Sequence, residues 1–254
     1  MKFLLLLFFL FPHLIFSAPA GNPSNPAIIE EGFVIPDTKW VNFRLGYQVY
    51  DAEDLVMQFD DLAKENDFYL RKVKAFSNTG IFTLNIKERL DLYTEIGSYR
   101  IEPEFRNLSS LYVTKSENDI IYRGGAKLIL FEVFDFTLAA DIKYSRFWAS
   151  SSFLTRNDRP INDDLKFSLK EWQIAVGLAQ KISILRPYIG IAYRDTQIEI
   201  KNAPFAITDL QLTFEKKAGL FLGTSASLGS YVLINGEVRL INERATSLLV
   251  ELRF

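Results

Sequence analysis

Long segments in which apolar and polar residues alternate constrain this chain more than any other feature of its sequence. From Trp40 onward, apolar side chains recur at every second position, most clearly over 41–49, 134–144, 172–178 and 246–254. Consecutive residues of a β-strand point to opposite faces of a sheet, so this period of two predicts strands with one apolar and one polar face. After the first 20 residues, the sequence holds no apolar run long enough to cross a membrane as a helix.

The connections between the expected strands differ in length on the two sides of the sheet. Further strands are expected at 72–86, 90–101, 120–130, 186–200, 209–226 and 232–240, which brings their number to ten. Short connections fall at 87–89, 132–133, 181–185 and 227–229, and longer ones at 51–71, 102–118 and 149–163. A tight turn at 242–244 is the exception, because it lies on the side of the long loops. Short turns at one rim and long loops at the other are typical of outer-membrane β-barrels.

We therefore expect an all-β fold, a transmembrane antiparallel β-barrel of about ten strands over residues 40–254, with eight or twelve strands as alternatives. A soluble β-sandwich also alternates apolar and polar residues. Its strands usually have five or six residues, whereas the expected strands are longer. The last alternating stretch ends on Phe254, and a terminal aromatic residue is a familiar feature of outer-membrane proteins. We expect Phe254 to be an assembly signal for the barrel-assembly machinery.

Aromatic side chains lie near the expected strand ends or on the apolar face. They are Trp40, Tyr47, Tyr144, Trp148, Trp172, Tyr188 and Tyr193. Tyr and Trp gather where a membrane meets water, so we expect these residues to contact outer-membrane lipid.

The first 20 residues have the features of a secretory signal peptide. Lys2 supplies a positive charge, residues 3–16 are almost wholly apolar, and small residues follow. A membrane anchor would need about 20 apolar residues, and Pro12 interrupts this shorter run. We expect cleavage after Ala18 or after Ala20, an irregular periplasmic segment at 21–39, and a location in the outer membrane.

Composition excludes many enzymes. The chain has no Cys, and its one His, His13, lies in the expected signal peptide. Ser-His-Asp triads, Cys nucleophiles and His- or Cys-based zinc sites therefore each lack a member, and we expect no enzyme. The acidic segment 51–71 lacks the ligand spacing of a calcium loop, so we expect neither a metal nor a cofactor. With 29 basic and 31 acidic residues, the chain is not expected to bind nucleic acid.

Charged side chains share the polar face of the expected strands and would point into the barrel. These candidate pore-lining residues are Arg44, Arg123, Lys127, Asp135, Asp141, Lys143, Glu171, Arg194, Glu237, Arg239, Glu251 and Arg253. One interpretation is a pore lining that sets ion preference. The other is a ladder of interior salt bridges that braces and fills a small barrel. The charges are mixed in sign, so no ion selectivity follows.

Four sequence blocks resemble the chlamydial major outer-membrane porin family. The first is the start of the expected mature chain, 21–26, and the second is 76–97 with its Leu-Asn-Ile before a charged turn. The third combines Glu171-Trp172-Gln173 with Arg186-Pro187-Tyr188-Ile189-Gly190, and the fourth runs from Val238 to Phe254. The blocks follow the family order and span most of the chain.

The resemblance implies an outer-membrane barrel that passes small hydrophilic solutes and contributes to the cell envelope. The chain departs from the family in two ways: it has no Cys for envelope disulfides, and it is much shorter than typical members. A ten-stranded barrel has a narrow lumen, whereas water-filled porins have about 16 strands. The leading expectation is a porin-like channel for small solutes and ions, and the alternative is a non-conducting structural or surface-interaction barrel. A homo-oligomer, the solute and any surface partner are left open.

Overall fold

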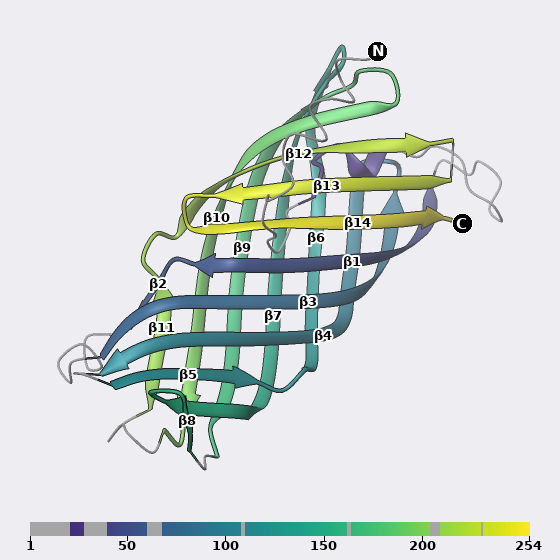
Figure 1. The fold of residues 1–254 in the computed structure, drawn as a ribbon. Coiled ribbons are helices and arrows are strands. Elements are labelled where there is room, and N and C mark those ends of the chain that lie inside the picture. The colour runs from purple at the N-terminus through teal and green to yellow at the C-terminus, as the bar shows by residue number, and fades with distance from the viewer. Residues whose placement is uncertain are drawn as a thin grey trace, which may run out of the picture.

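The chain folds into a closed antiparallel barrel. The computed structural model describes residues 21–27, 40–59, 68–107, 110–161, 164–203, 209–229 and 231–254. Within these residues, one sheet of fourteen strands closes on itself, and the strands run obliquely around a long cylinder (Figure 1). The expected signal peptide, residues 1–20, lies outside the described residues.

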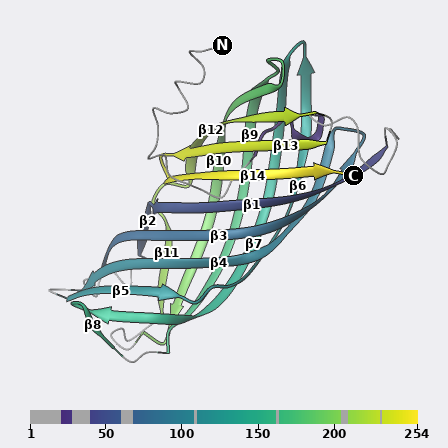
Figure 2. The same cartoon turned by 45° about the vertical axis from the view of Figure 1, so that its right-hand side comes forward.

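Ten long strands make the ring in the part of the barrel that holds the C-terminus. They are β1 (Val41–Leu55), β3 (Phe68–Ile86), β4 (Leu90–Asn107), β6 (Asp119–Val133), β7 (Phe136–Arg156), β9 (Lys166–Gln180), β10 (Leu185–Lys201), β12 (Ala218–Leu228), β13 (Val232–Leu240) and β14 (Glu243–Arg253). Each pairs with the next, and β1 pairs with β14 from Arg44↔Arg253 to Leu55↔Glu243. Both views show β14 beside β1 (Figures 1 and 2). The expected ten-stranded transmembrane barrel, closed by its first and last strands, is confirmed.

At the opposite end of the barrel, four short strands join the ends of the long ones. They are β2 (Met57–Phe59), β5 (Ser110–Ser116), β8 (Arg159–Pro160) and β11 (Leu210–Phe214). β5 takes the place of β6 between β4 and β7, and β8 folds back on β7. β2 continues from β1 and pairs with β11, which pairs with β10. Because the β13–β14 hairpin turns back early, fewer strands continue to this end: β2, β3, β4, β5, β7, β9, β10 and β11.

The long connections expected from sequence are largely strands. β1 extends to Leu55, β4 to Asn107 and β7 to Arg156, while β5 fills 110–116. β1, β4 and β7 have 15 to 21 residues, whereas about 9–11 residues cross a membrane, so these three strands extend well beyond one apolar band. Loops were expected at 51–71, 102–118 and 149–163. The described parts of these ranges are largely strands, which corrects the expectation.

Strand β10 shows how the barrel uses this extra length. Its apolar side chains face outward in the first part of the strand and inward in the second part. In the first half, Ile189, Ile191 and Tyr193 are exposed outward. Farther along the same outward face come Asp195, Gln197, Glu199 and Lys201. The inward face changes in the opposite sense, from the buried Arg194 to the buried Ile198 and Ile200.

Strands β4 and β9 invert at the same level. On β9 the outward residues nearer its C-terminal end are apolar: Trp172, Ile174, Val176 and Leu178. Those nearer its N-terminal end are polar: Lys166, Ser168 and Lys170. On β4 the inward Asp91 and Glu95 are followed by Tyr99, Ile101 and Phe105. The barrel therefore has two halves, named for their interiors: a charged half with an apolar outer wall, and an apolar half with a polar outer wall.

The interior of the apolar half is a packed hydrophobic core. Its buried members include Tyr50, Leu55, Phe59, Phe68, Ile101, Phe105, Tyr112, Phe147, Leu154, Phe167, Ile200, Leu212 and Phe214. Phe105 lies at its centre, with its ring 5.7 Å from that of Phe59 and 5.5 Å from that of Tyr112, measured between centroids. Such aromatic contacts and the burial of apolar area stabilise this half in the way that they stabilise a soluble protein.

Candidate functional site: the interior of the charged half

Eleven of the twelve candidate pore-lining residues lie buried inside the barrel. They are Arg44, Arg123, Lys127, Asp141, Lys143, Glu171, Arg194, Glu237, Arg239, Glu251 and Arg253. Each projects from a strand whose opposite face carries exposed apolar residues in the charged half. The period-two pattern therefore places these side chains in one interior.

Asp135 is the exception, and its expected inward position is wrong. It lies exposed in the two-residue turn between β6 and β7. Phe134 in the same turn has φ 52°, a left-handed conformation that ends the alternation of the strand. Strand parity therefore does not extend to Asp135.

Three buried carboxylates were not among the candidates. Asp91 and Glu95 lie on β4, where they share a parity opposite to that of Leu92 and Ile96, so alternation could have revealed them. Glu243 gave no such signal, because it was expected in the turn 242–244. In the structure it is the first residue of β14 and is fully buried. With these three, the buried side chains of the described residues include seven acidic and seven basic groups.

The first ionic cluster, the Arg44 cluster, joins β1, β4 and β14. Arg44 forms an ion pair with Asp91, and its Nε lies 3.7 Å from Glu251 Oε1. Asn85 Nδ2 donates a hydrogen bond of 2.6 Å to Asp91 Oδ1. One guanidinium group thus links two buried carboxylates, each of which needs a cation or a donor to offset its lost hydration.

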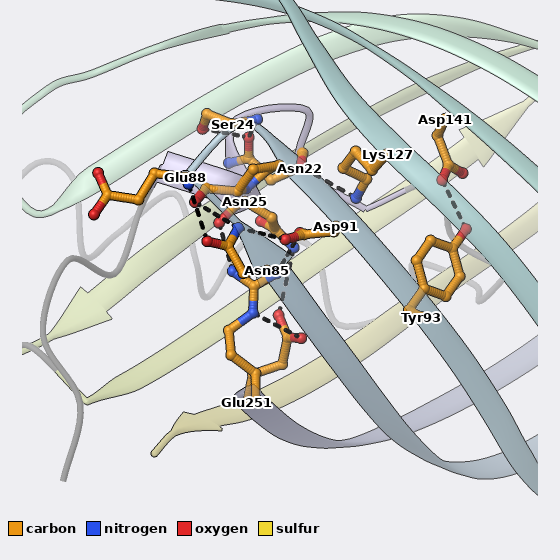
Figure 3. Close-up of polar contacts among 12 residues, drawn as sticks. Asn22, Ser24, Asn25, Asn85, Glu88, Asp91, Tyr93, Lys127, Asp141 and Glu251 are labelled. Carbon is orange, nitrogen blue, oxygen red and sulfur yellow. Dashed lines mark hydrogen bonds and ion pairs between the residues drawn. The ribbon is translucent and has the colours of Figure 1, made fainter. Parts of the chain in front are cut away.

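The second, the Glu95 cluster, joins β4, β6 and β7. Arg123 Nη1 and Lys143 Nζ each lie 3.2 Å from a carboxylate oxygen of Glu95. On β4 and β7, the hydroxyl of Tyr93 donates a hydrogen bond of 2.7 Å to Asp141 Oδ1, which Figure 3 shows. Two cations therefore share one carboxylate here, the reverse of the Arg44 cluster.

The third, the Glu243 cluster, is a chain of five charged groups from β9 to β14. Glu243 pairs with both Arg194 and Arg239, and Arg194 also pairs with Glu171. Arg239 Nε lies 3.0 Å from Glu237 Oε1. This chain contains three carboxylates and two guanidinium groups.

A segment of the chain's own N-terminal part lies inside the charged half. Residues 21–26 are buried, and Asn25–Ala27 form a short 3-10 turn. The expected irregular periplasmic segment is thus corrected for residues 21–27, which we call the N-terminal segment. Residues 28–39 lie outside the described part of the chain.

The wall of the barrel holds the backbone of this segment. Arg44 Nη1 donates to the carbonyl of Asn25 at 2.7 Å, Asn85 Nδ2 to that of Pro26 at 3.0 Å, and Lys127 Nζ to that of Asn22 at 3.2 Å. Figure 3 shows Lys127 pointing at Asn22.

The side chain of Asn22 fixes both the turn and the wall. Its Oδ1 accepts hydrogen bonds from the backbone N–H and the hydroxyl of Ser24, and its Nδ2 donates to Ser225 Oγ at 2.9 Å. Short polar side chains stabilise tight turns in this way. No sequence pattern signalled this position, because an Asn- and Pro-rich stretch is equally typical of a solvated leader.

Two small cavities lie among the interior side chains that the structure describes. A cavity of about 40 Å³ lies between the N-terminal segment and the wall, lined by Gly21, Asn25, Arg44, Glu95 and Lys127 among others. A second of about 10 Å³ lies at the boundary of the two halves, between Tyr50, Arg123 and Arg194. Since one water molecule needs about 10–15 Å³, these cavities have room for a few waters at most.

The boundary itself is formed by cations against aromatic rings. The guanidinium of Arg194 lies 5.0 Å from the ring centre of Phe214, and that of Arg123 lies 5.8 Å from Tyr50. These contacts are within the range at which a ring attracts a cation. The charged interior therefore ends directly on the apolar core.

Tyr188 corrects the expectation that it contacts lipid. It points inward from β10, is buried, and its hydroxyl donates to Glu237 Oε2 at 3.0 Å. Trp40, Tyr47, Trp148, Trp172 and Tyr193 are exposed, and Tyr144 is partly exposed.

The polar outer wall of the apolar half carries its own ion pairs. Glu102 Oε1 lies 3.0 Å from Arg100 Nε and 3.3 Å from Lys115 Nζ. Lys217, between β11 and β12, lies 2.6 Å from Asp195, and the hydrogen bond to this carboxylate raises the pKa of Lys217. Exposed pairs of this kind contribute little to stability but make the wall suited to water.

No metal site emerges from the residues that the structure describes. They contain no group of three or more His, Cys, Asp or Glu side chains that could hold a metal ion. Four carboxylates of the acidic segment, Asp60, Asp61, Glu65 and Asp67, lie outside the described ranges, as does Asp163. Among the described residues, no helix is long and apolar enough to span a membrane.

Comparisons with known proteins find similar solved structures only. No family model and no curated protein matches the chain. The outer-membrane protease OmpT from Escherichia coli is 7% identical, with a TM-score of 0.40 over 84% of this chain and 93% of its own. The β domain of the Bordetella autotransporter BrkA is 10% identical, with a TM-score of 0.43 over 83% and 98%. The translocator domain of the autotransporter NalP from Neisseria meningitidis is 12% identical, with a TM-score of 0.42 over 85% and 88%. At such scores these likenesses carry no statement about function.

Proposed function

We propose that this protein is a closed outer-membrane barrel that contributes to envelope structure and presents its apolar half outside the membrane. The observation that carries this proposal is the filling of the interior over both halves. The charged half contains 14 buried charged side chains and the N-terminal segment, and the apolar half contains the hydrophobic core.

The two fillings would block an ion for different reasons. In the charged half, each ion pair would have to break before its groups could bind a passing ion, and separating buried partners is costly. In the apolar half, an ion would lose its hydration among side chains such as Phe59, Phe105 and Phe214, which offer no polar partner. The second barrier remains even when the first is opened.

The alternative function is the porin-like channel that the sequence suggested. It needs the interior side chains to move apart into a continuous water-filled path. The cavities of about 40 and 10 Å³ support the closed barrel over this alternative.

Conductance in planar lipid bilayers tests the proposal. We expect no resolvable single-channel current from the wild-type protein, and none from a variant that lacks residues 21–27, because the apolar core stays in place. Current from the deletion variant alone would show that the N-terminal segment is the sole barrier. Current from the wild type would overturn the proposal in favour of the channel.

A charge-reversal variant adds a second test of the channel. Arg123→Glu with Lys127→Glu changes the interior charge by four units. A conducting barrel should then shift its reversal potential toward cation preference under a salt gradient. A closed barrel should instead unfold at lower temperature and pass no current, because its ion pairs are lost.

We further propose that the chain is a short member of the chlamydial major outer-membrane porin family. The four resembling blocks fall in the N-terminal segment, the β3–β4 hairpin, β9 and β10, and the β13–β14 hairpin. Much of their length lies in the charged half, where outward residues such as Ile191 and Leu248 are exposed. A family alignment in which these blocks align without gaps, and other members match the buried Glu243, supports this membership; an alignment that breaks them contradicts it.

Its proposed partners follow from the same half. The exposed apolar wall fits outer-membrane lipid, and the end of β14 fits recognition by the barrel-assembly machinery. The backbone N–H of Phe254 donates to the carbonyl of Phe43 at 2.9 Å, so the last residue still pairs with the first long strand. Deleting Phe254 should lower the amount of heat-modifiable protein in the membrane fraction. Unchanged insertion would contradict its role as an assembly signal.

We propose no catalytic role, since the chain beyond His13 has neither His nor Cys.

A further inference from the structure

The backbone nitrogen of Gly21 occupies an unusual place, in contact with a buried carboxylate. It lies 2.8 Å from Glu237 Oε2, deep in the charged half. The same oxygen accepts the hydroxyl of Tyr188 at 3.0 Å, and the other oxygen of Glu237 faces Arg239. The nitrogen of Gly21 is thus a third donor to this carboxylate.

The Glu243 cluster to which Glu237 belongs has one more carboxylate than cations. Glu171, Glu237 and Glu243 share Arg194 and Arg239. A cation stabilises a buried carboxylate more than a neutral amide N–H does. Lys127 is near, but its Nζ donates to the carbonyl of Asn22. A positive charge on the nitrogen of Gly21 would bring the cluster to three cations and three carboxylates.

We propose that Gly21 is the first residue of the exported chain and that its α-ammonium group pairs with Glu237. In this step a signal peptidase adds water across the peptide bond before Gly21: the C–N bond breaks, the carboxylate stays on Ala20, and the amine of Gly21 is protonated near neutral pH. Removal of the signal peptide therefore creates the charge that anchors the N-terminal segment in the interior.

Two further observations fit this position. Ala18-Pro19-Ala20 has the small-residue pattern that signal peptidases cleave after, whereas cleavage after Ala18 would leave Pro as the next residue. A Cβ at Gly21 would lie 2.9 Å from Lys127 Nζ, so a larger first residue would have to displace the end of that lysine side chain.

The rest of the segment is held by contacts that do not depend on the charge. The carbonyls of Asn22, Asn25 and Pro26 each accept a hydrogen bond from the wall. These contacts fix the distance along the chain from the wall to Gly21, so one added residue would move the ammonium group about 3.8 Å from its place. This gives the inference a sharp test, and one that does not depend on whether the barrel conducts.

The first experiment expresses the full-length precursor, purifies the protein from outer membranes, and determines its intact mass and N-terminal sequence. We expect a chain that begins at Gly21. A chain that begins at Pro19, or that keeps the signal peptide, overturns the inference.

The second experiment inserts one Ser between Ala20 and Gly21 of the precursor, with the product verified by mass. The Ser-extended protein should lose its folded, heat-modifiable form about 5 °C below the wild type, because the Glu237 pair is broken. In the Glu237→Gln background the same insertion should change the melting temperature by about 1 °C at most, because the partner is absent. Equal losses in both backgrounds, or no loss in either, overturn the ion pair.

A labelling measurement keeps the inference testable if Glu237→Gln fails to fold. The chain has no Cys, so Ser24→Cys introduces a single thiol at a buried position. In folded protein that begins at Gly21, this thiol should react with a maleimide at least about tenfold more slowly than in the Ser-extended form. The reason is that losing about 1.4 kcal/mol of anchoring free energy makes the open form, in which the thiol is exposed, ten times more populated. Equal rates in the two forms contradict anchoring by the ammonium group.

Discussion

The charged half and the apolar half of this barrel solve the same packing problem under opposite solvents. In the charged half, exposed Ile191 faces outward and buried Arg194 faces inward on one strand. In the apolar half, Gln197 faces outward and buried Ile198 faces inward. A strand has only two faces, so the side chains that suit lipid on the outside leave polar groups for the inside, and the reverse holds in water.

The comparison teaches that the two interiors obtain their stability from different forces. The apolar core is non-directional and depends on area and close packing. The charged interior depends on specific partners, since a buried ion without one is strongly destabilising. A structural change should therefore have different consequences in the two halves, and four substitutions measure the difference.

The largest effect is expected at the centre of the apolar core. Phe105→Ala removes a fully buried ring that contacts Phe59, Phe68 and Tyr112. The lost burial and the cavity should lower the free energy of unfolding by about 4 kcal/mol, as measured by urea titration in lipid bilayers. Phe153, which is exposed on the same half, is the matched control, and Phe153→Ala should cost below about 1 kcal/mol. Equal costs would show that the apolar half has no packed core.

The second effect is expected in the charged interior. Glu243→Gln keeps the shape of the side chain and removes the charge that Arg194 and Arg239 share. We expect the free energy of unfolding to fall by about 3 kcal/mol, because two buried guanidinium groups lose a counter-ion. A loss below about 1 kcal/mol would mean that water or other groups already compensate these charges.

The two halves also explain what the sequence could predict. Alternation was clear in segments such as 172–178, which lie wholly in the charged half, and the fold class and closure followed from them. It was weak over 186–200 because β10 inverts at the level of Arg194. Averaged along such a strand, both faces are mixed and the pattern weakens. The stretch 186–200 was still expected as a strand, whereas the continuations of β1, β4 and β7 were expected as loops. A sequence search that scores the alternation separately in the two parts of a strand would detect that its apolar and polar faces exchange sides.

Alternation could have revealed Asp91 and Glu95, but the other missed features of the site lie at positions that parity does not describe. Asp135 lies in a turn, Glu243 at the first residue after one, and Asn22 in a segment without regular structure. Their positions are set by contacts distant in sequence, such as Asn22 with Ser225 and Glu243 with Arg194. Such pairings cannot be read from one chain by periodicity.

The third substitution sharpens the comparison within a single strand. Ile191 and Gln197 lie on the same outward face of β10, six residues apart and on opposite sides of the inversion. Ile191→Lys should lower the free energy of unfolding in bilayers by about 2 kcal/mol, because the wall of the charged half faces lipid. Gln197→Lys should change it by at most about 0.5 kcal/mol. If the two variants unfold alike, the apolar band does not end at the inversion.

The smallest effect is expected on the polar wall of the apolar half. Glu102→Gln removes the partner of both Arg100 and Lys115, which are partly exposed to water. Solvent already hydrates these groups, so we expect a loss of about 0.5 kcal/mol at low salt. Since the Debye length falls to about 3 Å at 1 M salt, the loss should nearly vanish there, whereas the loss in Glu243→Gln should persist because its cluster is buried. Urea titrations of both variants at about 0.05 M and about 1 M salt make this comparison. If both losses disappear in salt, bulk water and ions reach the charged interior, and the contrast between a buried ionic interior and a solvated ionic wall is wrong.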